Sequence, residues 1–154
     1  FRGTLLEPEA RKQLELYTGL KFLEAGWIQN EINILGISPD GITANLTAQC
    51  EIKCPQAKKH LKTCIENEIP LDNINQCIHA FAINDKLESL FFISYRPESI
   101  KPIFVKELKR ADNVNIGTKA RPIIKTVDEC VTIIHSEAKL LEAQLKQTIN
   151  NLNF

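Results

Sequence analysis

The sequence contains no methionine, a single tryptophan and no excess of charge of either sign. Its 19 basic residues are balanced by 19 acidic ones, so any affinity for nucleic acid must come from the local placement of basic groups. No apolar run approaches the roughly 20 residues that a membrane-spanning helix needs, and no basic segment followed by an apolar stretch marks a secretion signal. We therefore expect a cytoplasmic protein without a membrane partner.

Cysteine occurs five times, but no CxxC pair is present. Four of the cysteines lie between residues 50 and 77, and their spacings match no common zinc or iron–sulfur ligand pattern. Because no secretion signal is present, we expect reduced thiols, some of them buried as small apolar groups.

The length of 154 residues suits one ordinary domain and is short for two, so we expect a single domain over residues 1–154. Hydrophobic residues make up 44% and charged residues 25%, which is typical of a globular protein. Since the chain begins with phenylalanine and lacks methionine, we expect that an N-terminal segment of the full protein is missing.

Hydrophobic periodicity and turn signals predict an α/β protein. Helices are expected over residues 4–18, 56–68, 70–84 and 127–152, the first capped by Thr4 and ended by Gly19. Strands are expected over residues 21–29, 33–37, 42–46, 48–54, 90–95 and 102–108, and the polar segment 110–121 is expected to be a loop. This order predicts a central mixed β-sheet flanked by helices and followed by a long C-terminal helix.

The C-terminal helix carries a heptad-like stripe. Its members are Val127, Val131, Ile134, Ala138, Leu141, Leu145, Thr148 and Leu152. Such a stripe serves equally for packing along the helix's own domain, which is the interpretation we favour, and for a contact between subunits.

The predicted chemistry centres on Asp40, Glu51 and Lys53. Glu51 and Lys53 are two positions apart on one predicted strand, so they project to the same face, while Ile52 projects to the other. A Glu-x-Lys pair alone is common on solvated strands. The acidic turn at Asp40, eleven positions before Glu51, is what favours a site.

Two carboxylates beside an ammonium group suit magnesium-dependent hydrolysis of a phosphodiester. Magnesium prefers one or two carboxylates together with water and substrate phosphate. The cation polarises the phosphate and acidifies a water, and Lys53 can orient that water or take its proton. The main-chain carbonyl of Ile52, between the two side chains, could be a further ligand.

A basic cluster follows the predicted strand at Lys58, Lys59, His60 and Lys62. These groups could contact a DNA backbone, or they could form an ordinary solvated helix face, and the sequence favours neither.

The segments 36–41 (GISPDG) and 51–55 (EIKCP) resemble the signature of the YqaJ-type viral recombinase, or lambda-phage exonuclease, family. This family belongs to the restriction-endonuclease-like PD-(D/E)XK nuclease superfamily. The opening segment 3–11 (GTLLEPEAR) and the Ile69-Pro70 pair leading to Gln76 are similar to further motifs of the family. The four motifs keep the family's order, and they span residues 3 to about 97.

The resemblance implies a restriction-endonuclease-like core and a role for each matched residue. Asp40 and Glu51 would be metal ligands and Lys53 the catalytic lysine, with one or two Mg²⁺ ions that Mn²⁺ may replace. Glu7 would reach into the site to help hold a second metal or its waters, and Gln76 would position the water or the phosphate. The chain departs from the family at position 73, where asparagine stands in place of a frequent tyrosine.

The resemblance further implies a magnesium-dependent exonuclease acting on double-stranded DNA from 5′ to 3′, which makes single strands for homologous recombination. It implies a ring-shaped homotrimer, a single-strand annealing protein as partner, and action in the cytoplasm of a bacterial or phage host. Three alternatives stay open: an endonuclease or repair nuclease on the same scaffold, a DNA-binding module without catalysis, and a structural protein built on the long C-terminal helix.

Overall fold

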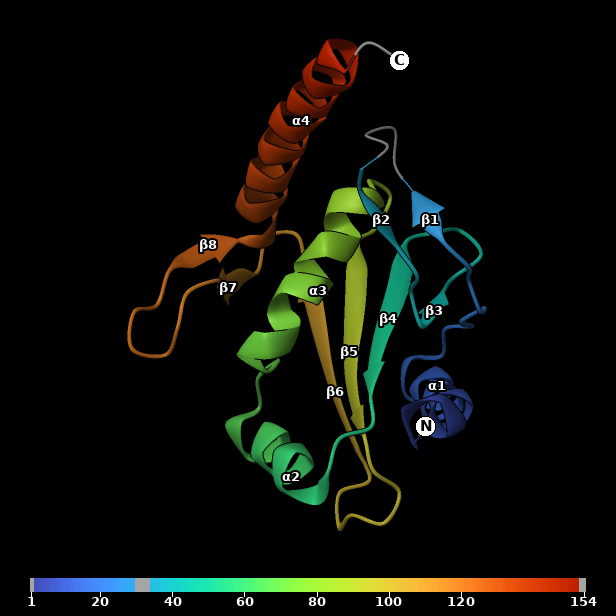
Figure 1. Cartoon of the computed structure of the whole chain (residues 1–154). Helices are drawn as coiled ribbons and strands as arrows, with labels where there is room; N and C mark the ends of the chain where they lie inside the picture. The colour runs from blue at the N-terminus through green and yellow to red at the C-terminus, as the bar shows by residue number, and fades with distance from the viewer. Residues whose placement is uncertain (1, 30–33, 153–154) are drawn as a thin grey trace.

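The centre of the molecule is a four-stranded sheet, described in a computed structural model that covers residues 2–29 and 34–152 (Figure 1). Its strands, β3 (Gly41–Ile42), β4 (Ala48–Lys53), β5 (Ser89–Tyr95) and β6 (Ile103–Lys109), lie in the order β3-β4-β5-β6. Only the β4–β5 pair is parallel; β3–β4 and β5–β6 are antiparallel. The predicted mixed sheet is therefore confirmed.

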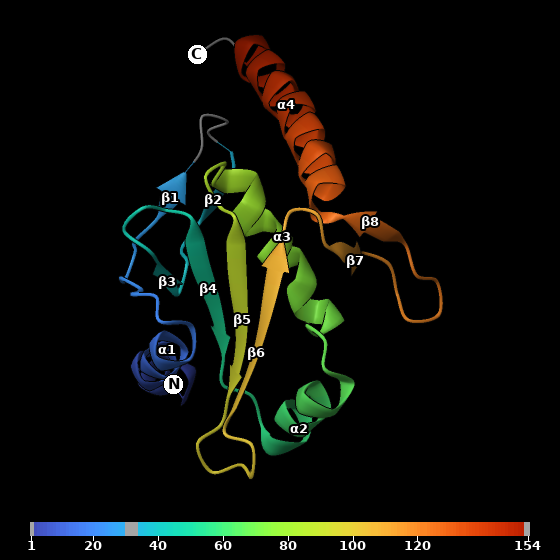
Figure 2. The same ribbon diagram turned by 180° about the vertical axis from the view of Figure 1, so that it is seen from behind.

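Helices cover both faces of this sheet (Figures 1 and 2). A parallel pair needs a crossover connection, which α2 (Ala57–Glu66) and α3 (Leu71–Ile83) provide between β4 and β5. α3 packs on one face of the sheet and α1 (Arg2–Thr18) on the other. α4 (Val127–Asn151) follows the sheet and completes the predicted α/β fold with its long C-terminal helix.

Alternation along the strands divides the core into two clusters. On the α1 side, Cys50 and Ile52 of β4 pack with Ala10 and Leu14 of α1 and with Ile93 of β5. On the α3 side, β5 and β6 contribute apolar side chains that pack beneath α3, among them Leu90, Phe92, Phe104 and Leu108. The strands between the two helices are thus buried on both sides.

The first helix differs from its prediction at the start. It begins at Arg2, so Thr4 is not its cap, and Pro8 lies inside it. Pro8 has no N–H to donate to the carbonyl of Thr4, so one hydrogen bond of the helix is lost there. The end is as predicted: Gly19, at φ +72°, donates its N–H to Glu15 O at 2.9 Å.

Two predicted strands before the sheet are mostly irregular. In the described part of these segments, β1 (Ile28–Gln29) pairs with β2 (Gly36–Ile37), and Leu23 forms a single bridge to Ile42. Residue 33 lies outside the described residues. The predicted strand over 42–46 is also too long, since β3 ends at Ile42. The chain turns there because Asn45 Oδ1 accepts a hydrogen bond from the N–H of Thr47 at 3.2 Å and Leu46 adopts φ 67°.

The predicted loop over 110–121 contains part of a hairpin instead. β7 (Asn113–Asn115) pairs antiparallel with β8 (Ile124–Thr126). Asn115 Oδ1 accepts from the N–H of Gly117 at 2.9 Å and of Ile123 at 3.0 Å, so one side chain organises the intervening loop. The polar composition of the segment gave no signal for a hairpin, because the hairpin depends on side-chain to backbone hydrogen bonds rather than on alternating apolar residues.

The C-terminal helix packs on the domain only through its first half. Thr126 and Glu129 form a capping box at its start. Its buried residues end at Ala138, whereas Leu141 and Leu145 are 50% and 44% exposed. The distal half points away from the sheet (Figures 1 and 2). Packing along the domain is therefore confirmed for the proximal half alone, and none of the described helices is both long and apolar enough to cross a membrane.

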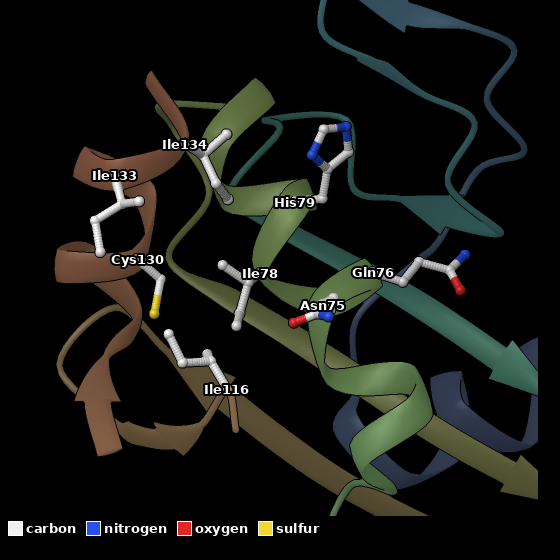
Figure 3. A pocket seen from close by; sticks show the side chains of 8 residues that line it. All are labelled: Asn75, Gln76, Ile78, His79, Ile116, Cys130, Ile133 and Ile134. Carbon is white, nitrogen blue, oxygen red and sulfur yellow. The ribbon is translucent and has the colours of Figure 1, made fainter. Parts of the chain in front are cut away.

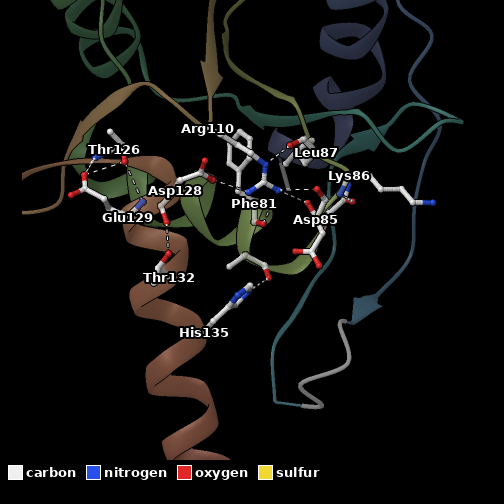
Figure 4. Close-up of polar contacts among 12 residues, drawn as sticks. Phe81, Asp85, Lys86, Leu87, Arg110, Thr126, Asp128, Glu129, Thr132 and His135 are labelled. Carbon is white, nitrogen blue, oxygen red and sulfur yellow. Dashed lines mark hydrogen bonds and ion pairs between the residues drawn. The ribbon is translucent and has the colours of Figure 1, made fainter.

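Arg110 joins the end of α3 to the start of α4 (Figure 4). Its Nη2 donates to the carbonyls of Asn84 at 3.1 Å and Asp85 at 3.2 Å, and its Nε donates to Leu87 O at 2.9 Å. Its Nη1 pairs with Asp128 of α4 at 3.1 Å. A planar guanidinium can satisfy several carbonyls left open at a helix end while keeping a charge partner, which an ammonium group cannot do.

Replacement of Arg110 by alanine is expected to lower the free energy of unfolding by about 2–4 kcal/mol, because several charge-assisted hydrogen bonds are lost together. Arg110→Lys should recover little of this loss, since it keeps the charge without the fork. Urea denaturation followed by circular dichroism measures both variants. Lys109→Ala, which removes only an exposed pair with Glu107, is the matched control. A loss no larger than that of the control would contradict the proposed joint.

Gly41 permits the close approach of β3 to β4. A Cβ at this position would lie 2.8 Å from Cys50 Sγ and 3.2 Å from Phe22 Cβ. Gly41→Ala should therefore lower the free energy of unfolding by about 1–3 kcal/mol through overpacking. Gly26→Ala is the control, because nothing lies within 4 Å of a Cβ there. Equal midpoints of urea denaturation for the two variants would show that the contact at Gly41 relaxes without cost.

Candidate active site

Asp40 is fixed at the point where β3 begins. Its Oδ2 accepts a hydrogen bond from the Ile52 N–H at 2.7 Å, so the carboxylate extends the pairing of β4 beyond the end of β3. Its own carbonyl accepts from Arg11 Nε of α1 at 2.9 Å. The residue is therefore held through both side chain and backbone, which gives its carboxylate one defined position next to β4.

Glu51 and Lys53 form an ion pair on β4. The prediction that they share a face is confirmed, and that face is the one beneath α3, since Cys50 and Ile52 lie on the α1 side. Both faces of β4 are covered, because every β4 residue except Lys53 is buried. Helices cover both faces of β4, so Glu51 is only 3% exposed.

Burial and mutual repulsion perturb the acids of this cluster. Burial raises the pKa of Glu51 to about 7, the nearby charge of Asp40 adds to the rise, and the pairing with Lys53 opposes it. Burial also raises the pKa of Asp40, although the hydrogen bond from Ile52 and the charge of Lys53 oppose this. Asp40 thus lies close enough to Glu51 to disfavour the charge of Glu51, as in a site that takes up a cation.

The pKa of Lys53 is also raised, which in a lysine favours the charged form. Burial acts to lower the pKa of Lys53, but its bond to Glu51 and the charges of Glu51 and Asp40 outweigh burial, so the pKa of Lys53 is raised. Lys53 is therefore held as a cation, paired with Glu51 and near the charge of Asp40. It balances part of their negative charge.

The α3 helix contributes the roof of the site. Burial raises the pKa of the Cys77 thiol to about 12, and the charge of Glu51 adds to this rise. Cys77 therefore lies above the β4 pair. Gln76, its neighbour on α3, is exposed and points away from α4 (Figure 3). Within the described residues, Gln76 forms no hydrogen bond to Asp40, Glu51 or Lys53, so the structure brings it beside the site rather than into it.

The α1 helix borders the site from the other side. Glu7 and Arg11 are four residues apart on α1, and both line a cavity of about 290 Å³ together with Ser38 and Asp40. The charge of Glu7 also contributes, as the smallest effect, to the raised pKa of Glu51. Sequence reasoning gave no role to Arg11, although its spacing from Glu7 places both on one helix face, which was the available signal.

The backbone of β4 offers one more oxygen. The N–H and C=O of a strand residue point to the same side, so the Ile52 carbonyl is directed toward Asp40, as its N–H is. That this carbonyl is a metal ligand stays a prediction.

The donor set of this cluster fits magnesium better than a closed metal site. No three His, Cys, Asp or Glu side chains gather as a metal-binding group anywhere in the described residues, so Glu7 does not complete such a set with Asp40 and Glu51. Two carboxylates are nevertheless what Mg²⁺ commonly takes from a protein. Glu51 Oε1 is buried, and apart from its ion pair with Lys53 it accepts no hydrogen bond from the described residues, so it keeps ligand capacity.

Two crystal structures share this fold. One is an alkaline exonuclease, LHK-Exo, from Laribacter hongkongensis, at a TM-score of 0.65 and 24% identity over 98% of this chain and 74% of that one. The other is LHK-Exo in complex with dAMP, at a TM-score of 0.64 and 24% identity over 98% and 73% of the two chains. At this identity the likeness establishes the fold.

The sequence comparisons establish the family. No curated protein matched the chain. The model of the YqaJ-like viral recombinase domain matches residues 1–86, more than half of the chain, and this range includes Glu7, Asp40, Glu51, Lys53 and Gln76. The chain therefore belongs to the family of YqaJ-like viral recombinase domains.

Proposed function

We propose that this protein is a metal-dependent deoxyribonuclease that removes nucleotides from the ends of double-stranded DNA, in the 5′ to 3′ direction. The observation that carries the proposal is the cluster at the start of β3, where the Asp40 carboxylate bonds to Ile52 of β4 beside the Glu51–Lys53 pair. Family membership and the fold shared with an alkaline exonuclease support it. The LHK-Exo complex with dAMP, a mononucleotide, adds support for a nucleotide product.

The residues that would hold Mg²⁺, or Mn²⁺ in its place, are Asp40, Glu51 and the carbonyl of Ile52. When bound, the cation would supply charge to the scissile phosphate and lower the pKa of a water. Glu7 lies at the edge of the adjoining cavity, where it would bind waters rather than complete the carboxylate set. One ion is the number that the Asp40–Glu51 pair itself supports, and a second would depend on Glu7.

Lys53 would orient the attacking water and offset negative charge at the reacting phosphate. In hydrolysis the water oxygen forms a bond to phosphorus and the bond from phosphorus to the 3′-oxygen breaks. The products carry a 5′-phosphate and a 3′-hydroxyl, which takes up a proton. Held as a cation, paired with Glu51 and near the charge of Asp40, Lys53 can orient the water and offset the negative charge that grows on the phosphate oxygens. Gln76, exposed beside the site, is available to contact the water or the phosphate.

The wider role follows as part of the same proposal. Removal of one strand from duplex ends would leave single strands for recombination, which a single-strand annealing protein could take up. A ring of three chains around DNA is supported by the apolar residues that the distal half of α4 exposes, including Leu141 and Leu145. Because the chain has no net charge, such a ring would have to gather its basic groups on the inner wall.

Digestion of linear duplex DNA, labelled at one 5′ end, tests the activity directly. Release of label as mononucleotide is expected with Mg²⁺ and not with EDTA. Glu51→Gln should lower the rate by a factor of about 100 or more because it removes a metal ligand, and Lys53→Ala should do so because it removes transition-state stabilisation. Glu137→Gln, an exposed change on α4, is the control and should match wild type.

Digestion of DNA substrates with different ends distinguishes an exonuclease from an endonuclease and from a protein without catalysis. Cutting of covalently closed circular DNA would replace the exonuclease with an endonuclease on the same scaffold. Inert wild-type protein across blunt, recessed and single-stranded ends, with either metal, would overturn catalysis altogether.

The raised pKa of Glu51 predicts that metal affinity depends on pH. A proton on Glu51 competes with the cation, so below its pKa of about 7 the affinity for Mn²⁺ should fall up to tenfold for each unit of pH. Above this value the affinity should level off. Isothermal titration calorimetry at pH 6, 7 and 8 measures this, with Glu51→Gln expected to bind weakly and with a flatter dependence. Equal affinity of the wild type at pH 6 and 8 would show that Glu51 is not a ligand.

A further inference from the structure

Buried polar atoms without hydrogen bonds are concentrated beside the proposed site. In the described part of the chain, four such side-chain atoms occur: Gln49 Nε2, Gln49 Oε1, Asn73 Oδ1 and Glu51 Oε1, the last of which has only its ion pair with Lys53. Three of the four belong to β4, and the Asn73 atom belongs to the first turn of α3. Leaving a buried polar group unsatisfied costs about 1–3 kcal/mol, so a cluster of them calls for a functional explanation.

Gln49 is the most complete case, because both polar atoms of its side chain lack partners and the residue is only 1% exposed. Its lateral neighbours cannot supply partners: Ile42 of β3 and Leu90 of β5 pair with it, and both side chains are apolar. On the turn side, the hydroxyl of Thr47 already donates to Asn45 Oδ1 at 3.0 Å. The remaining polar neighbour along the strand is Glu51.

Gln49 and Glu51 are matched as donor and acceptor. They project from the same face of β4, two residues apart, which places their Cα atoms roughly 7 Å from each other. Gln49 Nε2 is a buried donor without an acceptor, and Glu51 Oε1 is a buried acceptor that has no partner in the described residues besides Lys53. In the present arrangement Lys53 pairs with this same oxygen of Glu51. A change of rotamer, rather than of backbone, would bring the two together.

We propose that Gln49 is a positioning residue for Glu51: its side-chain amide donates to the Glu51 carboxylate when that carboxylate leaves Lys53 to bind a divalent cation. The inference rests on the proposed metal-dependent function. A cation beside Glu51 repels the Lys53 ammonium, so the carboxylate loses a partner at the moment when its orientation matters most. Gln49 supplies a neutral hydrogen bond from the opposite side, which fixes the carboxylate without competing for its charge.

This role has a signature that core filling lacks. If Gln49 only filled space, an apolar side chain of similar size would stabilise the protein and leave metal binding unchanged, because two unsatisfied atoms would disappear. If Gln49 positions Glu51, the same change would leave the metal-free protein as stable as before, or more so, while it weakens metal binding. Stability and metal affinity therefore move in different directions.

The experiment is a measurement of Mn²⁺ binding by electron paramagnetic resonance on wild type and Gln49→Leu, together with urea denaturation of both in EDTA. We expect Mn²⁺ to bind about tenfold or more weakly to Gln49→Leu, the usual scale for loss of a ligand's hydrogen-bond partner, with no loss of stability. Cys50→Ala is the matched control, because it perturbs the same strand on the α1 side. Gln49→Met, a flexible apolar replacement, is the second variant if leucine disrupts the fold.

A spectroscopic measurement on the wild type needs no variant. The side-chain NH₂ resonances of Gln49 should shift when Mg²⁺ is added, as they enter a hydrogen bond to Glu51. Wild-type affinity for Mn²⁺ in folded Gln49→Leu or Gln49→Met, or side-chain resonances that stay in place on saturation with Mg²⁺, would overturn the role of Gln49. Failure of the wild type itself to bind Mn²⁺ would instead overturn the metal-dependent function on which the inference depends.

Discussion

The main physical constraint in this structure is a carboxylate that is buried in the middle of a sheet. Glu51 lies on β4, which has a strand on each side and a helix on each face, so water cannot solvate its charge. Such a group must be neutralised, paired or bound to a cation. Lys53 provides the pairing. Asp40, held by Ile52 and Arg11, adds a second negative charge, which makes the charged form of Glu51 less favourable. The fold thus maintains an electrostatic conflict that a divalent cation would resolve.

The scaffold around β4 is built to hold that conflict in place. β3 is only two residues long, and its brevity frees the edge of β4 at Ile52 for the Asp40 side chain. The crossover through α2 and α3 then covers the charged face, and α1 covers the apolar face. Rigidity at the far end comes from Arg110, which ties the end of α3 to α4 and so fixes the helix that roofs the site. The acids themselves keep few partners, since the Asp40 carboxylate accepts from Ile52 and the Glu51 carboxylate pairs with Lys53.

The elements that could be predicted from the sequence are those with a strong local signal. β4, β5, β6 and all four helices follow from periodicity, and the shared face of Glu51 and Lys53 follows from alternation along a strand. What failed depended on side-chain to backbone bonds or on tertiary packing. Asn45 and Asn115 organise turns by accepting N–H groups, which shortened β3 and created the β7–β8 hairpin. His60 belongs to a basic run in the sequence, yet it is fully buried and contacts Ser94 Oγ at 2.8 Å and Lys101 O at 2.6 Å.

The partial docking of α4 has a consequence for local stability. Helices shorter than about 12–15 residues are marginal in water without packing, and the segment beyond Ala138 has no buried residue to support it. The free energy of local opening should therefore fall along α4, from near the global value at Val127 to near zero at the distal turns. Amide hydrogen exchange would then behave as a gradient along one continuous helix. In any assembly that covers the distal half, the same amides become protected from exchange. The exchange rates of these amides would therefore show whether the distal half is covered.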